Sequence, residues 1–137
     1  MSTPIGHDDH ELVRTFEAGN EPQGGFHHRE HVRVAWYYLL QHPLPDALSR
    51  FSARLRNFAA ARGKPGLYHE TITVAYILFI NERLDGAGRT LPWEQFAATY
   101  PELLSWKPSL LDRYYTPATL SSERARRTFV MPDKVNQ

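Results

Sequence analysis

Histidines are concentrated in two short segments of the chain. His27, His28 and His31 lie in the first segment, and His69 is followed by Glu70 in the second. Residues three or four apart share a face of an α-helix, so His28 and His31 have the spacing of a ligand pair. Two or three neutral imidazoles with a carboxylate bind Zn, Fe, Mn, Ni or Cu. The sequence therefore predicts a divalent transition metal held by His28, His31, His69 and Glu70.

The apolar pattern of the first segment selects among its histidines. At 100° per residue, His28 and His31 fall with Val32 and Ala35 in one sector about 100° wide, the usual width of a buried helix face. His27 lies at the edge of this sector. We therefore expect His28 and His31, rather than His27, to face the core.

Several kinds of function fit this set of residues. Two or three protein ligands leave coordination positions open, which favours a metal-dependent enzyme, a hydrolase, lyase or oxygenase, acting on a small molecule. Glu70 would be a ligand or the general base, with Tyr68 beside it. Metal-free acid–base catalysis with a histidine oriented by Glu70 is an alternative. A different alternative is a non-catalytic helical binding or regulatory module with an aromatic pocket or a dimer face, in which the histidines are structural or sense pH.

Other side chains are candidates for contact with a ligand. Trp36 and Tyr68 lie on or near the histidine segments, and aromatic side chains often line pockets for flat or apolar ligands. Arg126 lies in the serine-capped segment 121–127, and arginines near a pocket commonly bind a carboxylate or phosphate. The alternative roles are core packing for the aromatic residues and a solvated helix face for Arg126.

The elements that must position these residues are predicted to be helices. Apolar residues recur at steps of three and four, as at Leu48, Phe51, Leu55 and Phe58. We expect helices over 9–18, 27–41, 46–62, 68–84, 92–99, 109–115 and 121–127, followed by an extended tail. Segment 68–84 is apolar on nearly every side, which predicts a central, covered helix, although its β-branched residues also suit a buried strand. The predicted fold is an all-α, irregular bundle of about five to six helices around this buried central helix.

The composition is that of an ordinary globular domain. The chain has 137 residues, and its 16 basic and 15 acidic side chains nearly balance. This balance argues against a nucleic-acid or membrane-surface binder, and the lack of cysteine excludes disulfides and thiolate metal sites. No long apolar run or secretion signal is evident. We expect one cytoplasmic domain over residues 1–137, with mobile ends at 1–8 and 133–137, and a homodimer stays open.

Three motifs make the chain similar to a known family. They are F-x-H-x-x-H-V-R-x-A-W at 26–36, Y-H-E-T-I-T at 68–73 and L-x-x-x-x-A-R-x-x-F-V-x-P-D at 120–133. Their spacing resembles that of a family of small uncharacterised bacterial proteins, over about residues 24–133. The resemblance implies the same choice of histidines, with His27 a variable position, and it implies no established activity.

Overall fold

The protein has an all-α fold, as predicted. The computed structural model describes residues 4–134, and no strand occurs in that range. The helices are α1 (His7–Glu17), α2 (His28–Gln41), α3 (Leu44–Ala61), α4 (Glu70–Arg83), α5 (Trp93–Thr99), α6 (Pro117–Leu120) and α7 (Glu123–Arg127). Short 3-10 helices are η1 (Pro65–Leu67), η2 (Gly86–Thr90), η3 (Pro101–Leu103) and η4 (Leu110–Arg113). The first five predicted helices agree with α1–α5 to within two residues at each end.

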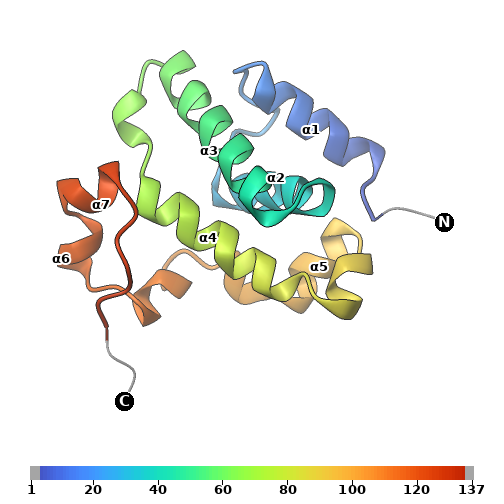
Figure 1. Ribbon diagram of the computed structural model, residues 1–137. Coiled ribbons are helices and arrows are strands. Elements are labelled where there is room, and N and C mark those ends of the chain that lie inside the picture. The colour runs from blue at the N-terminus through green and yellow to red at the C-terminus, as the bar shows by residue number, and fades with distance from the viewer. Residues whose placement is uncertain (1–3, 135–137) are drawn as a thin grey trace.

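Helix α4 runs through the middle of the molecule (Figure 1). It packs against α2, α3 and α7. Ile77 and Ile80 are completely buried, and only Leu78 among the large apolar residues of α4 is markedly exposed. An apolar helix covered on nearly every side is therefore the centre of the bundle, as its sequence indicates, and the strand alternative for this segment is wrong.

Helix α3 follows the predicted amphipathic pattern. Phe51, Leu55 and Phe58 are buried, whereas the arginines of this helix are exposed. The helix ends at Ala61, and Gly63 in the following turn has a φ of 73°, in the left-handed region that favours glycine. The N–H of Lys64 donates to the carbonyl of Ala59 across this turn at 2.9 Å. This turn fixes where Lys64 leaves the helix.

The side chain of Glu30, in the first turn of α2, caps the beginning of this helix. The backbone N–H of His27 donates to Glu30 Oε1 at 2.7 Å. The preceding Gly25 has a φ of 96°, and a Cβ at that position would lie 2.7 Å from Nε2 of His27. The positive φ therefore favours a glycine at residue 25, where the chain turns into α2 with His28 as its first residue.

The C-terminal segment is fastened to the beginning of α4 through Thr71. This residue is completely buried, and its Oγ1 donates towards the carbonyl of Ala125 at 2.7 Å and accepts the N–H of Val130 at 3.1 Å. The hydroxyl of Tyr115 donates to the carbonyl of Val130 at 2.6 Å. These bonds hold α7 and the tail against the N-terminal part of α4. Figure 1 shows α7 beside that end of the helix.

The later helices differ from the prediction in their boundaries. Segment 109–115 contains only the 3-10 helix η4, capped by Ser109. Helix α6 begins at Pro117, in a segment where no helix was predicted, because Thr116 caps it and proline suits a first helical position. Helix α7 is capped by Ser122.

The chain ends were predicted to be mobile. Residues 1–3 and 135–137 lie outside the described residues. Helix α1 already begins at His7, and the carboxylate of Asp133 accepts hydrogen bonds from Thr116 and Thr119 at 2.7–2.9 Å. In residues 4–134, no helix has the length and apolar character that crossing a membrane requires.

Candidate functional site

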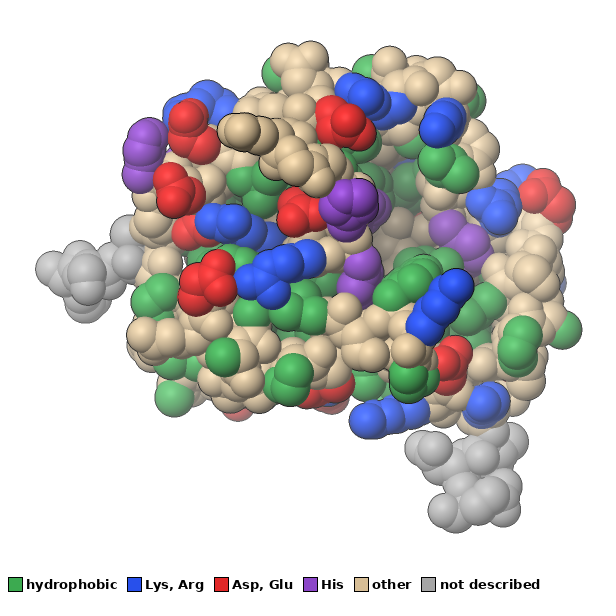
Figure 2. All heavy atoms as spheres, turned by 180° about the vertical axis from the view of Figure 1, so that it is seen from behind, with side chains coloured by type: hydrophobic (Ala, Val, Ile, Leu, Met, Phe, Trp, Pro, Cys, Tyr) green, Lys and Arg blue, Asp and Glu red, His purple; other side chains and the backbone are tan. Residues whose placement is uncertain are grey.

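A cavity of about 490 Å³ lies between α2, α3 and α4. Its walls are mainly apolar and aromatic: Val32 and Ala35 come from α2, Phe51, Leu55 and Phe58 from α3, and Ile72 from α4. The cavity opens on the face shown in Figure 2, where histidine and apolar side chains gather around a hollow. Its size is within the range of small-molecule sites, about 300–1,000 Å³.

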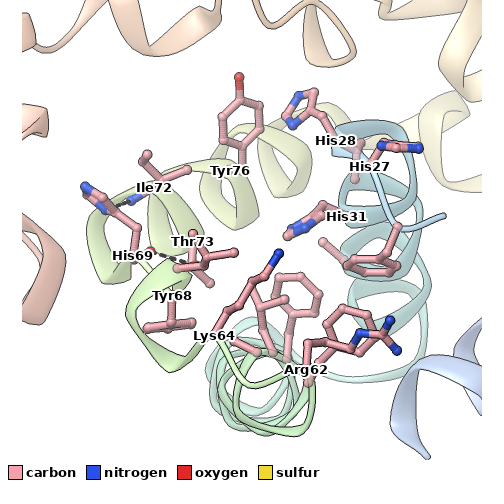
Figure 3. A pocket seen from close by; sticks show the side chains of 18 of the residues that line it. His27, His28, His31, Arg62, Lys64, Tyr68, His69, Ile72, Thr73 and Tyr76 are labelled. Carbon is pink, nitrogen blue, oxygen red and sulfur yellow. Dashed lines mark hydrogen bonds between the residues drawn. The ribbon is translucent and has the colours of Figure 1, made fainter. Parts of the chain in front are cut away.

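His31 points into this cavity (Figure 3). Its ring lies against Phe26, with 4.5 Å between ring centroids, and neither ring nitrogen has a hydrogen-bond partner among the described residues. Burial, and then the nearby His28, lower the pKa of His31 to about 4. At neutral pH the ring is therefore uncharged, with one N–H donor and one acceptor nitrogen facing the cavity.

His28 lies on the same wall, three residues earlier in α2. Its Nε2 donates to the carbonyl oxygen of Leu103 at 2.8 Å, and its ring packs against Tyr76 and Trp106. Burial lowers the pKa of His28 below the usual value. Because the carbonyl can only accept, Nε2 carries the proton and Nδ1 keeps its lone pair.

His69 also lines the cavity, but both of its ring nitrogens are occupied. Nδ1 accepts the N–H of Ile72 at 3.2 Å, so His69 is the N-cap of α4. Nε2 donates to the carbonyl of Leu120 at 2.7 Å. The ring can make no further bond in this position without giving up one of these two.

Glu70 is not part of the cavity wall. Its Oε1 accepts from Arg56 at 2.9 Å and from the hydroxyl of Tyr68 at 2.5 Å. Arg56 also lies 4.6 Å from the centre of the Tyr68 ring. Tyr68 lines the cavity, and burial, together with the hydrogen bond to Glu70, raises its pKa. Glu70 and Tyr68 thus form a cluster with Arg56, and the Glu70 carboxylate is directed to that cluster.

Of three further residues named from the sequence, two lie outside the cavity wall and one lies at the edge of the cavity. Trp36 is completely buried against Trp93 and does not line the cavity. Arg126 donates to the carbonyl of Gly66 at 2.7 Å and is not in the cavity wall either. His27 is exposed at the cavity edge and donates to the carbonyl of Gly24 at 3.1 Å.

The predicted metal ligands are thus only partly brought together. His28, His31 and His69 share one cavity, although they come from segments about forty residues apart in the chain. In the part of the chain that the structure describes, no three His, Asp or Glu side chains form a group that could hold a metal ion. Among the predicted ligands, the two hydrogen bonds of the His69 ring and the direction of the Glu70 carboxylate leave only the two histidines of α2 with free ring nitrogens at the cavity.

Lys64 and Trp106 are among the cavity residues that were not foreseen. Lys64 lies in the turn between α3 and η1, and Trp106 lies in the loop between η3 and η4. Trp106 is 44% exposed and covers His28 with 4.8 Å between ring centroids. Neither residue belongs to a periodic segment. The only sequence signal was the position of Lys64 just ahead of the Tyr68–His69 pair.

The chain matches no protein-family model, and neither the curated proteins nor the solved structures gave a match. The resemblance to a bacterial family stays a prediction, and the functional argument rests on the geometry of the cavity.

Proposed function

We propose that the protein binds a small, largely apolar molecule in the cavity between α2, α3 and α4. The observation that carries the proposal is His31, an uncharged imidazole whose nitrogens face an apolar cavity and have no partner among the described residues. Apolar pockets with a few well-placed polar groups are typical of small-molecule sites. The walls would supply affinity, and His31 would supply orientation.

The neutral state of His31 determines which hydrogen bonds its ring can make with a ligand. Its ring can donate one hydrogen bond and accept another, which suits a hydroxyl, carbonyl or acid group on the ligand. A ligand that bonds these nitrogens inside an apolar cavity would gain about 0.5–1.5 kcal/mol for each hydrogen bond.

The placement of Glu70 favours binding over His/Glu acid–base catalysis. A general base or its orienting partner must reach the reacting group or the imidazole within hydrogen-bond distance. The Glu70 carboxylate instead bonds Arg56 and Tyr68, and it does not line the cavity. The cavity therefore fits a binding module, with the histidines of α2 as polar contacts.

A metal-dependent reaction is the second candidate function. It is favoured by Nδ1 of His28 and by the two free nitrogens of His31, which share one cavity wall. Two imidazoles would leave most coordination positions to water and substrate. Elemental analysis of protein purified without a polyhistidine tag tests it, with His28→Ala and His31→Ala expected to lose the metal and His27→Ala to keep it. Protein without stoichiometric metal would count against this candidate.

A neutral fluorescent probe tests the binding proposal. N-phenyl-1-naphthylamine fluoresces strongly in dry apolar sites, and we expect saturable binding to the wild-type protein. Ala59→Phe places a ring in the cavity, whereas Ala60→Phe, the matched control, adds the same ring at an exposed neighbouring position of α3. Ala59→Phe should weaken binding about tenfold or more, and Ala60→Phe should leave it unchanged. Equal binding by the two variants would contradict the proposal.

A further inference from the structure

The Lys and Arg residues that line the cavity are not matched by any acidic residue in the described part of its wall. Among the described residues that line it there is no Asp or Glu, while Arg62 and Lys64 both contribute to its edge. The whole chain nearly balances acidic and basic residues, so this local excess is not a property of the composition. Cationic groups beside a low-dielectric cavity raise the local concentration of anions.

Lys64 is the cation that is free to bind. Its side chain is exposed and has no hydrogen bond or ion pair among the described residues. Figure 3 shows its amine directed into the cavity, towards the ring of His31. The Gly63 turn at the end of α3 places the Lys64 backbone at the cavity edge.

Arg62 is already engaged. Its guanidinium lies 3.6 Å from a carboxylate oxygen of Glu21 and 5.9 Å from the centre of the Phe58 ring. These contacts hold Arg62 at the edge of the cavity, where the Glu21 carboxylate offsets its charge. The ammonium of Lys64 therefore remains as the direct partner for an anion.

We propose that the ligand is a small organic carboxylate, whose apolar body fills the cavity and whose acid group is bound by Lys64 and His31. The inference rests on the binding function proposed above and names its ligand class. A carboxylate oxygen can accept the ammonium N–H of Lys64, and the same group can accept the N–H of His31. The aromatic walls supply the apolar contact.

The donors present suit a carboxylate better than a phosphate. Phosphate sites usually combine several backbone N–H groups at a helix N-terminus with an arginine fork. Here His69 caps α4 by accepting from Ile72, and Glu30 caps α2 by accepting from His27. One ammonium and one imidazole N–H match a singly charged group.

A pair of isosteric ligands tests the inference by titration calorimetry at neutral pH and low salt. 1-Naphthaleneacetic acid is ionised under these conditions, whereas 1-naphthaleneacetamide has nearly the same shape and no charge. We expect the acid to bind the wild-type protein about tenfold more tightly, as for a charge-assisted hydrogen bond. Lys64→Met keeps the aliphatic stem and should remove this preference, because it weakens binding of the acid far more than binding of the amide.

Arg50→Met is the matched control. It removes one positive charge from an exposed position of α3 outside the cavity, so it should keep the preference for the acid. Equal affinities of acid and amide for the wild-type protein, or a preference that survives Lys64→Met, would overturn the carboxylate inference and leave apolar binding standing. Failure of both ligands to bind the wild-type protein would contradict the binding function itself.

Discussion

The Nε2–H of His69 donates to the carbonyl oxygen of Leu120 at 2.7 Å, across 51 residues of sequence. This bond ties the last turn of α6 to the first turn of α4. Nδ1 of the same ring caps α4 by accepting from Ile72. Both ring nitrogens of His69 are thus occupied, one by the bond to α6 and one by the cap of α4, although the ring lines the cavity.

His69→Ala should therefore lower the stability of the protein more than its ligand binding. The loss of an N-cap costs about 0.5–2 kcal/mol, and the second hydrogen bond adds about 1 kcal/mol. We expect urea denaturation to show a decrease of roughly 1–3 kcal/mol, with the affinity for N-phenyl-1-naphthylamine within a few-fold of wild type. His69→Asn should recover the part that belongs to the cap. Unchanged stability with loss of binding would show that His69 contacts the ligand.

The pair Glu70 and Arg56 should contribute little to stability. Arg56 is 51% exposed, and partly exposed ion pairs are worth about 0.2–1 kcal/mol. Glu70→Gln should cost less than about 1 kcal/mol and leave binding of the neutral probe unchanged. A double-mutant cycle with Arg56→Gln measures the coupling. A large loss of binding in Glu70→Gln would restore the carboxylate to the site, as a ligand or a base.

The long helices were predictable because their apolar residues repeat with the helical period. Phe51, Leu55 and Phe58 in α3 show this directly. Helix α6 and the 3-10 helix η4 are too short to show a period, and they are set by the local caps Thr116 and Ser109. Such caps are visible in the sequence only after the boundaries are known.

The site was predictable where a helical wheel applies. His28 and His31 were placed together by their angle on α2, and both line the cavity. Trp36 lies about 140° around the helix from His31 at 100° per residue, so it faces the Trp93 side instead. Lys64 and Trp106 come from a turn and a loop, where tertiary packing, rather than any local pattern, directs the side chains.

The pH dependence of stability should report on His31. In the unfolded chain a histidine takes up a proton below pH about 6.5, whereas burial delays this step in the folded protein, where His31 has a pKa of about 4. The unfolded state therefore binds more protons between these values, and the free energy of unfolding falls as the pH falls. For His31 alone the loss by pH 5 is about 2 kcal/mol.

His28 acts in the same direction, because burial lowers its pKa too. The ionisable groups nearest His31 are His28 on α2 and Lys64 in the turn between α3 and η1. Denaturant titrations at pH 7 and pH 5 measure the loss, and His31→Gln should reduce it because the titrating group is gone. A wild-type loss that His31→Gln leaves unchanged would show that His31 is readily protonated in the folded protein.

Nuclear magnetic resonance of the histidine rings tests the binding of an apolar molecule beside His31 most directly. The chain has seven histidines, and the His31→Gln spectrum assigns the His31 signal. On titration with 1-naphthaleneacetamide, we expect a saturable ring-current shift of the Cε1–H signal of His31, with the exposed His7 unmoved. A saturable interaction that leaves the His31 signal in place, or the absence of any shift, would contradict binding in the cavity.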